Sequence, residues 1–225
     1  MNKKIIAIIP ARGGSKGIPR KNIKDLAGKP MIAYIIESVK KVQGVDRVIV
    51  STEDEEIYRV AKKYGAEAPF MRPIELAQDE VATLPVLRHA VKYLLENENY
   101  SPDYVLLVYP TSPLLKAERI QEIIDLGLKK NSDSVISGTY DKGHYWIESD
   151  GGWERLYPTE LRNRQLAKSL FKENGAIYLI RTSILEKQLV ADKTDIFIMD
   201  LEENIDVDTM EDFKRVEIIL QKNNQ

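Results

Sequence analysis

Short apolar runs alternate with amphipathic segments over the first 138 residues of the chain. Three of the runs are rich in β-branched residues and short enough to be buried strands, at 5–9, 47–51 and 104–108. The segments that follow them keep apolar residues at helical spacing, at 31–42, 52–64, 83–96 and 117–129. This alternation predicts an α/β fold with a mainly parallel sheet.

Two of the expected helices carry a capping signal at their start. Thr52 stands three residues before Glu55, and Thr209 stands three residues before Asp212. A hydroxyl and a carboxylate at this spacing can satisfy free N–H groups of the first helical turn. We therefore expect helices to begin at both places. Further strands are expected at 134–137, 176–180 and 196–199.

The alternation is interrupted between residues 138 and 170. The sequence Asp150-Gly151-Gly152 is a hairpin signal, and rings crowd around it, at Tyr140, His144, Tyr145, Trp146, Trp153 and Tyr157. An aromatic hairpin of this kind can be a subunit interface, a lid or a plain extension of the sheet, and we favour the interface. The 225 residues are expected to form a single domain, 1–225, with an inserted dimerisation or lid element at 139–171.

The loop after the first strand combines glycines with positive charge. Pro10 ends the strand, and the next twelve residues contain Gly13, Gly14 and Gly17 together with Arg12, Lys16, Arg20 and Lys21. Glycines allow backbone N–H groups to turn toward a ligand, and the cations attract an anion. The pattern favours a polyphosphate site over the alternative of a solvated basic turn.

The charge is local rather than general. The chain has a net charge of −2, but residues 10–24 contain five cations and no anion. That contrast argues for an anion site and against a nucleic-acid surface. The loop has neither the GxxxxGK[ST] spacing of a P-loop nor the GxGxxG of a dinucleotide-binding fold, so both classes lose support.

Two carboxylates stand two residues apart near the C-terminus, at Asp206 and Asp208. In an extended segment they point to the same face, with Val207 directed into the core. Two carboxylates on one face suit Mg²⁺, which binds one or two carboxylates together with phosphate oxygens and water. The alternative is a solvated acidic turn, to which Glu202 and Glu203 would also belong.

Other side chains predict less. Ser112 follows the strand at 104–108, where ligands bind in open α/β sheets, but a tight proline-rich turn explains it equally well. His89 and His144 lack the spacing of metal ligands. The chain has no cysteine, which excludes disulfides, thiolate chemistry and cysteine-ligated zinc.

Nothing in the sequence predicts a membrane partner. No stretch is long enough to span a bilayer. The N-terminal apolar run ends at Pro10 and Arg12, too early for a signal peptide, and no small-residue cleavage site follows. We expect a cytoplasmic protein.

Seven sequence blocks, in order, resemble those of the CMP-sialic acid synthetases, or acylneuraminate cytidylyltransferases. The blocks are IIPARGGSKGIPRKN, GKPMIAYII, VIVSTEDEEI, RPIELAQD, PTSPL, NGAIY and IDVDT. The resemblance covers nearly the whole chain and implies a Rossmann-like, glycosyltransferase-A-like nucleotidyltransferase domain with a small dimerisation element. It also implies transfer of CMP from CTP to the anomeric 2-hydroxyl of a nine-carbon α-keto acid sugar, with release of pyrophosphate and with Mg²⁺ as cofactor.

The resemblance also implies roles for individual residues. It gives catalytic roles to Lys21, Arg12 and Asp208, and assigns CTP to Arg12, Gly13, Gly14, Ser15, Lys16, Lys21, Asn22 and Arg72. Of these, Asn22 and Arg72 lie near cytosine and Lys21 near the α-phosphate. Asp206 and Asp208 would hold Mg²⁺. The sugar would meet Tyr109, Ser112 and Tyr178, together with Arg164 of the partner subunit in a homodimer.

The chain departs from the sialic acid pattern at sugar-facing positions. Tyr109 stands where the family often has Gln, and Lys172-Glu173 stand where Arg-Pro is common. Residues 188–190 lack an aromatic pair that some members use against the N-acyl group. Legionaminic and pseudaminic acids are therefore alternatives to N-acetylneuraminate. Enzymes that act on Kdo or on a sugar 1-phosphate, and a non-catalytic nucleotide-binding relative, are further alternatives.

Overall fold

The structure is a computed structural model of the chain, and it describes residues 3–141, 143–156, 170–200 and 203–223. Its centre is a six-stranded sheet in the order β10-β6-β9-β5-β1-β4. The strands are β1 (Ile5–Pro10), β4 (Arg47–Ser51), β5 (Tyr104–Val108), β6 (Ser134–Asp141), β9 (Leu170–Arg181) and β10 (Asp195–Ile198). β1 pairs in parallel with β4 and β5, and β10 with β6, whereas β9 runs antiparallel between β5 and β6. The predicted α/β fold with a mainly parallel sheet is confirmed.

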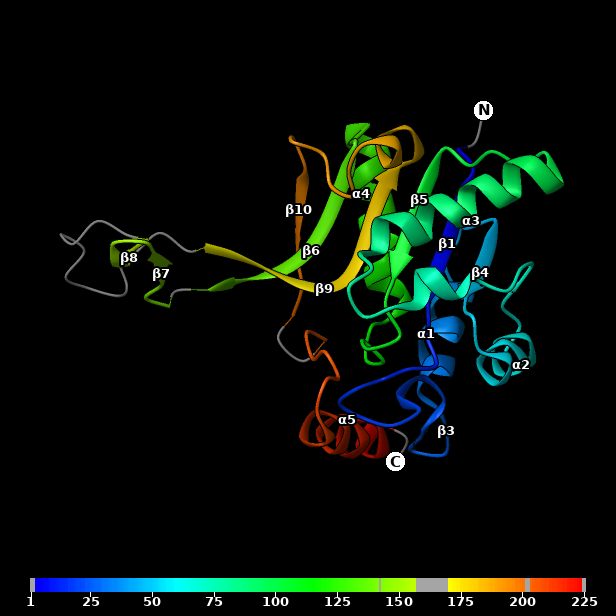
Figure 1. Cartoon of the computed structure of the whole chain (residues 1–225), viewed down its shortest axis with the longest axis horizontal. Helices are drawn as coiled ribbons and strands as arrows, with labels where there is room; N and C mark the ends of the chain where they lie inside the picture. The colour runs from blue at the N-terminus through cyan, green and yellow to red at the C-terminus, as the bar shows by residue number, and fades with distance from the viewer. Residues whose placement is uncertain (1–2, 142, 157–169, 201–202, 224–225) are drawn as a thin grey trace.

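Helices cover both faces of the sheet (Figure 1). They are α1 (Met31–Lys40), α2 (Glu55–Lys63), α3 (Thr83–Glu98), α4 (Ala117–Lys130) and α5 (Met210–Asn223), with short 3₁₀ turns η1 (Lys21–Ile23), η2 (Ile74–Ala77) and η4 (Thr182–Glu186). Two short strands, β2 (Asp25–Leu26) and β3 (Lys29–Pro30), form a small ribbon before α1. None of the described helices is both long and apolar enough to cross a membrane.

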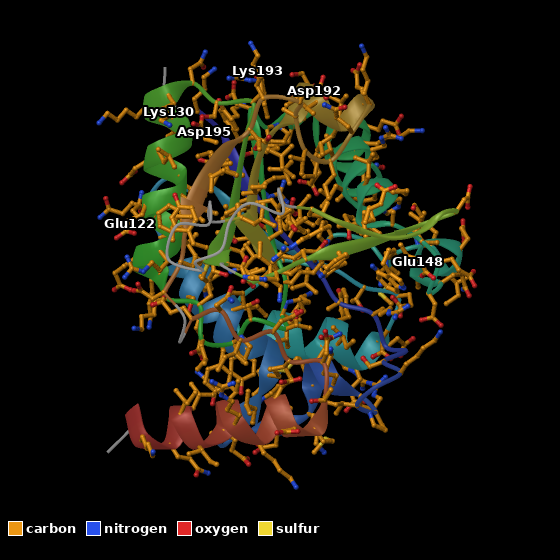
Figure 2. The ribbon with its side chains drawn as sticks, turned by 90° about the vertical axis from the view of Figure 1, so that its left-hand side faces the viewer. Glu122, Lys130, Glu148, Asp192, Lys193 and Asp195 are labelled. Atoms are coloured by element: carbon orange, nitrogen blue, oxygen red, sulfur yellow. The ribbon has the colours of Figure 1, made fainter. Side chains whose placement is uncertain are left out.

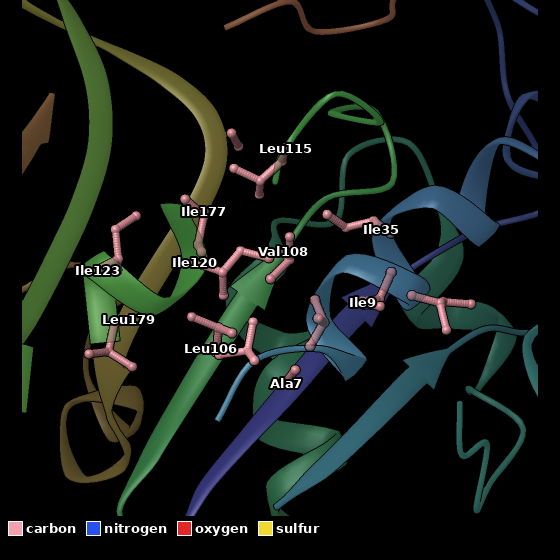
Figure 3. Close-up of a cluster of buried hydrophobic side chains, with 14 of the residues drawn as sticks. Ala7, Ile9, Ile35, Leu106, Val108, Leu115, Ile120, Ile123, Ile177 and Leu179 are labelled. Atoms are coloured by element: carbon pink, nitrogen blue, oxygen red, sulfur yellow. The ribbon is translucent and has the colours of Figure 1, made fainter. Parts of the chain in front are cut away.

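The alternation of side chains along β1 builds two cores. Ala7 and Ile9 face the cluster formed with α1, α2 and α4, which Figure 3 shows around Ile35, Leu106 and Ile120. Ile6 and Ile8 face the opposite cluster with α3. Both faces of the strand are buried, which explains why its sequence is a continuous apolar run rather than an alternating one.

A third cluster lies at the C-terminal side of the sheet. There α5 packs Phe213 and Val216 against Ile18 of the N-terminal loop and against Val207. Figure 1 shows α5 beside that loop, far from the hairpin. This small core fixes the loop and the segment before α5 relative to one another.

Most expected boundaries agree with the structure to within a few residues. The strand at 104–108 is observed with the predicted bounds, and the helices at 83–96 and 117–129 extend to Glu98 and Lys130. The capping signal at Thr209 and Asp212 is confirmed: Asp212 N–H donates to the Thr209 hydroxyl at 3.2 Å, and Thr209 N–H donates to the Asp212 carboxylate at 2.9 Å.

The predicted cap at Thr52 is wrong. The N-cap of α2 is Asp54, whose carboxylate accepts hydrogen bonds from the N–H groups of Glu56 and Ile57, both at 2.9 Å. The Thr52 hydroxyl accepts from the N–H of Asp54 instead. Two of the residues at 52–55, Thr52 and Asp54, are of a type that caps helices, and the carboxylate of Asp54 is held in place by its pair with Arg20.

The strands β6 and β9 are longer than expected. They continue past the sheet as an antiparallel pair that matches Gly138 with Glu173 and Asp141 with Leu170. This pair leads to the hairpin of β7 (Trp146–Ser149) and β8 (Gly152–Arg155), which Figure 1 shows projecting away from the sheet. The predicted hairpin at Asp150-Gly151-Gly152 is therefore present, and its turn residue Gly152 has a φ of 114°.

Asp54→Ala is expected to destabilise the protein by about 1 kcal/mol, because it removes the cap of α2. The Arg20 guanidinium, which donates to Asp54 at 3.0 Å, holds the pKa of that carboxyl below its usual range. A depressed carboxyl pKa stabilises the fold above the unfolded-state value of about 3.9, and this contribution is lost as the pH falls through the folded value. Urea unfolding of both proteins at pH 7 and below pH 4 should show the difference shrink in acid; a constant difference would contradict the assignment.

Candidate active site

A cleft of about 390 Å³ opens where the parallel strands β1 and β5 end. Ligands bind at this edge in open α/β sheets. Eight residues singled out from the sequence line it: Arg12, Ser15, Lys16, Lys21, Asn22, Arg72, Tyr109 and Asp208. The chain brings them together from both ends and from the middle of the sequence, so the cleft exists only in the folded protein.

Glu53, which the sequence did not single out, joins the glycine loop to Arg72. Its carboxylate accepts the N–H of Gly13 at 2.6 Å on one oxygen and the Arg72 guanidinium at 2.5 Å on the other. The N–H of Gly13 is therefore engaged by protein rather than free for a phosphate. A Cβ at Gly13 would lie 2.6 Å from the carboxylate of Asp54, so the close packing of this loop against residues 53–54 requires glycine.

Arg72 and Asn22 form the buried floor of the cleft. Arg72 is 5 % exposed, and its Nε has no hydrogen-bond partner within the described ranges. Arg72 nevertheless lines the cleft, and a guanidinium offers several N–H donors to a ligand with carbonyl or ring-nitrogen acceptors. Asn22 donates its side-chain amide to the carbonyl of Arg12 at 2.9 Å, which fixes the start of the loop.

Asp79 neutralises two of the loop cations. Its carboxylate pairs with Arg12 at 2.5 Å and with Lys16 at 2.7 Å. Lys16, followed by Arg12, lowers the pKa of the Asp79 carboxyl, so Asp79 is ionised at neutral pH. Sequence reasoning missed this residue. Asp79 could have been found from its position as the last residue of the RPIELAQD block.

Lys21 connects the loop to the paired carboxylates near the C-terminus. Its Nζ donates to the carbonyl of Val207 at 2.6 Å and lies 3.2 Å from an oxygen of Asp208. Arg20, with a φ of 58°, turns the chain immediately before Lys21. The Lys21 side chain is largely withdrawn from solvent, so its direction is set by the protein.

Gly17 touches the same segment through its backbone. A Cβ at this position would lie 2.5 Å from the carbonyl oxygen of Asp208. The loop and the Asp208 segment therefore approach as closely as two backbones can, and glycine is required by the contact rather than by its φ angle.

Asp206 and Asp208 are both exposed, and Val207 between them is fully buried, as the alternation predicted. Asp206 lies outside the lining of the cleft. The pKa of Asp206 is raised although the residue is exposed, because the surrounding protein partly desolvates its carboxylate. The negative charge of Asp208 raises this pKa further, whereas a hydrogen bond from the Thr111 side chain lowers it.

These two carboxylates fit a magnesium ion. Their mutual repulsion is relieved by a cation, and their oxygens are the hard donors that Mg²⁺ prefers. No group of three or more metal-ligating side chains occurs among residues 3–141, 143–156, 170–200 and 203–223. The remaining positions around an ion here would be left to phosphate oxygens and water, as is usual for Mg²⁺ in nucleotide enzymes.

Tyr109 and Tyr178 stand beside Asp206. Their rings meet edge to face with centroids 6.4 Å apart. The Tyr109 hydroxyl shares a 2.6 Å hydrogen bond with Thr83, and the Tyr178 hydroxyl donates to Glu173 at 3.2 Å. Burial, with the charges of Glu173 and Asp206, raises the pKa of Tyr178, which keeps this hydroxyl a donor at neutral pH.

The remaining predicted residues lie beside the cleft, away from it or outside the described part of the chain. Gly14 lines a second depression beside the cleft, to which Ser15 also contributes. Ser112 is buried in the turn after β5 and does not line the cleft, which agrees with the tight-turn alternative for it. Arg164 falls at 157–169, outside the described residues.

A family model described as Cytidylyltransferase matches residues 6–223 of the chain. The chain belongs to the cytidylyltransferase family. This cytidylyltransferase is 32 % identical to pseudaminic acid cytidylyltransferase of Campylobacter jejuni, with 99 % of this chain and 98 % of that protein covered. It is 31 % identical to CMP-N,N'-diacetyllegionaminic acid synthase of Legionella pneumophila, with 99 % and 98 % covered. It is 32 % identical to N-acylneuraminate cytidylyltransferase of Escherichia coli, with 100 % of this chain and 54 % of that protein covered.

Two solved structures support the same fold. CMP:2-keto-3-deoxy-manno-octonic acid synthetase complexed with CTP aligns with a TM-score of 0.72 at 19 % identity, over 98 % of this chain and 99 % of that one. The 4-diphosphocytidyl-2C-methyl-D-erythritol synthase of Anaerococcus prevotii aligns with a TM-score of 0.69 at 17 % identity, over 98 % and 100 %. The expected Rossmann-like nucleotidyltransferase fold is confirmed, and the cytidylyltransferase is a nucleotidyltransferase enzyme.

Gly17→Ala is expected to destabilise the fold by about 1 kcal/mol or more, because the added methyl group overlaps the Asp208 carbonyl. Thermal unfolding measures the change. Gly14→Ala is the matched control in the same loop, since a Cβ there meets nothing within 4 Å. Equal melting temperatures for the two variants would show that the loop does not pack against Asp208 in solution.

Proposed function

We propose that the chain transfers CMP from CTP to the anomeric 2-hydroxyl of a nonulosonic acid and releases pyrophosphate. The observation that carries the proposal is the contact of Lys21 with Val207 and Asp208, which joins a basic glycine loop to a carboxylate pair. The loop supplies positive charge for a triphosphate, and the carboxylates fit a magnesium ion. The names of the relatives support both the cytidylyl group and an acceptor of the nonulosonic type.

The cleft residues then have distinct tasks. Arg12 and Lys16 bind the triphosphate, which replaces the Asp79 carboxylate as their partner. Asn22 and Arg72, which both line the cleft, hold the cytosine. Lys21 lies between the loop and Asp208 and is the cation assigned to the α-phosphate.

The reaction forms a bond from the acceptor oxygen to the α-phosphorus and breaks the bond from that phosphorus to the β-phosphate oxygen. Catalysis in such a transfer is mainly positioning and charge neutralisation. Asp206 and Asp208 would hold Mg²⁺, which supplies positive charge to the phosphates when bound. The hydroxyl proton leaves as the new bond forms, and Asp208, whose carboxylate lies 3.2 Å from Lys21 Nζ, is the residue assigned to accept it.

We assign recognition of the acceptor sugar to the residues around Tyr109 and Tyr178. Tyr109 and Glu173, the positions that depart from the sialic acid pattern, lie next to Tyr178 and close to Asp206. The relatives that match over nearly their full length are named for pseudaminic and legionaminic acids. These two observations favour such an acid over N-acetylneuraminate as the acceptor. The need for CTP places the proposed reaction in the cytoplasm.

The projecting hairpin of β7 and β8 is assigned to the interface of a homodimer. Trp146 on β7 and Trp153 on β8 are 54 % and 65 % exposed, and Ile147, also on β7, is 52 % exposed. Large apolar side chains gathered on a projecting element mark an interaction surface. In such a homodimer Arg164 is assigned to the sugar site of the partner subunit.

Pyrophosphate release from CTP and Mg²⁺ with a panel of nonulosonic acids tests the reaction. Asp208→Ala is expected to abolish release, because it removes a carboxylate from the proposed ion, yet to leave the fold intact, since Lys21 keeps its bond to the Val207 carbonyl. Circular dichroism and thermal unfolding provide the control for folding. Absence of release with every acid would refute the function. Near-normal release by the variant would refute both roles assigned to Asp208, as a metal ligand and as the proton acceptor, and would leave the function standing.

Trp153→Glu is expected to convert the homodimer to a monomer, because a charge at the centre of an apolar contact is costly to bury. Light scattering gives the mass of both proteins in solution. Leu95→Glu, an exposed apolar position on α3 away from the hairpin, is the matched control. A wild-type protein that is monomeric and still active would contradict the interface.

A further inference from the structure

Glu203 is a buried charge that the reaction does not use directly. It is 3 % exposed, and among the residues that the structure describes only Arg72 is another buried charged side chain. Burying a carboxylate is costly unless it is paired. Its partners are Lys116, with an N···O distance of 3.2 Å, and the Nε of Arg119, at 3.1 Å.

These partners belong to the start of α4, and the turn before α4 forms part of the cleft. Pro110 and Thr111 line the cleft, and the carbonyl of Thr111 accepts the N–H of Val207 at 2.8 Å. The segment 203–208 is thus attached at both ends to the region 111–119. The Glu203 ion pairs make one attachment, and the Val207 hydrogen bond makes the other.

The side chains along this segment alternate. Glu203, Ile205 and Val207 are buried, whereas Asp206 and Asp208 are exposed. A slip by one residue would bury the two aspartates and expose the apolar side chains, so the apolar pattern excludes it. A slip by two residues keeps that pattern, but it would remove the carboxylate from Lys116 and Arg119 and leave a different residue there.

We propose that Glu203 is a positioning residue: its ion pairs with Lys116 and Arg119 set the register that places Asp208 in the lining of the cleft and leaves Asp206 exposed beside it. The inference rests on the proposed function, because it concerns the carboxylates assigned to Mg²⁺. Glu203 does not line the cleft. It acts through the backbone that it anchors.

Glu203→Gln in the full chain tests the proposal, since the amide keeps the shape and removes the charge. The Mg²⁺ concentration for half-maximal pyrophosphate release is expected to rise about tenfold or more, the usual effect of losing a residue that orients metal ligands. Hydrogen exchange of the peptide that covers 203–209 is the second readout. The part of its protection that comes from the Val207 N–H, which donates to the Thr111 carbonyl, is expected to be lost.

Asp195→Asn is the matched control. Asp195 pairs with Lys130 at the far end of α4, and Figure 2 shows the two residues side by side there, apart from Glu122 on the same helix. The Asp195→Asn substitution removes an ion pair that, like the Glu203 pairs, joins α4 to a later segment, but it does so away from the cleft. Both the Mg²⁺ requirement and the exchange of 203–209 are expected to stay at wild-type values in this variant.

The outcomes separate the proposal from the function on which it rests. If Glu203→Gln matches Asp195→Asn in both measurements, the positioning role is overturned. If the wild-type protein releases no pyrophosphate, the proposed function fails, and exchange at 203–209 still decides whether Glu203 sets the register. If Glu203→Gln does not fold, Lys116→Met replaces it, because this variant leaves the Arg119 pair in place. It is expected to shift the Mg²⁺ requirement and the exchange of 203–209 in the same direction but by less. If neither measurement shifts, the positioning role is overturned.

Discussion

The hydrogen bonds of Lys21 to the Val207 carbonyl and the Asp208 carboxylate hold the site together across 186 residues of sequence. A lysine that is largely withdrawn from water needs such partners, because an unpaired buried cation is costly. The contact can form only when β1 delivers the loop and the third core delivers the Val207 segment. Gly17 permits it, since the two backbones touch beside it. The rest of the cleft depends on this one junction.

The cations of the cleft are all paired in the absence of nucleotide, but the pairs differ in kind. The partners of Arg12, Lys16 and Lys21 are the exposed carboxylates Asp79 and Asp208. The partner of Arg72 is Glu53, which also holds the loop backbone and is itself mostly shielded from water. A polyanion can replace an exposed carboxylate with little desolvation, whereas breaking the Glu53 pair would strand a buried charge. The exposed pairs are therefore exchangeable, and the Glu53 pair is part of the framework on which the cleft is preorganised.

Buried ion pairs recur where the chain has to hold irregular backbone in one place. Glu53 fixes the glycine loop, and Glu203 fixes the segment before α5. Neither region has a strand ladder or a helix to define its register. Directional charge pairs provide that definition, which an apolar contact alone does not.

The sequence by itself determined the local features: β5 with its bounds, the helices predicted at 83–96 and 117–129, the cap at Thr209 and the hairpin at Asp150-Gly151-Gly152. It also determined the glycine loop and the exposed pair Asp206 and Asp208, because period-two and period-3.6 patterns and turn residues act over a few positions. It did not reveal that β9 runs antiparallel, that Asp54 caps α2, or that Glu53, Asp79 and Glu203 pair with cations. Those outcomes depend on which distant groups come within a few ångströms of one another. Only the completed tertiary structure decides that, because electrostatic partners are selected by position in space and not by spacing in the chain.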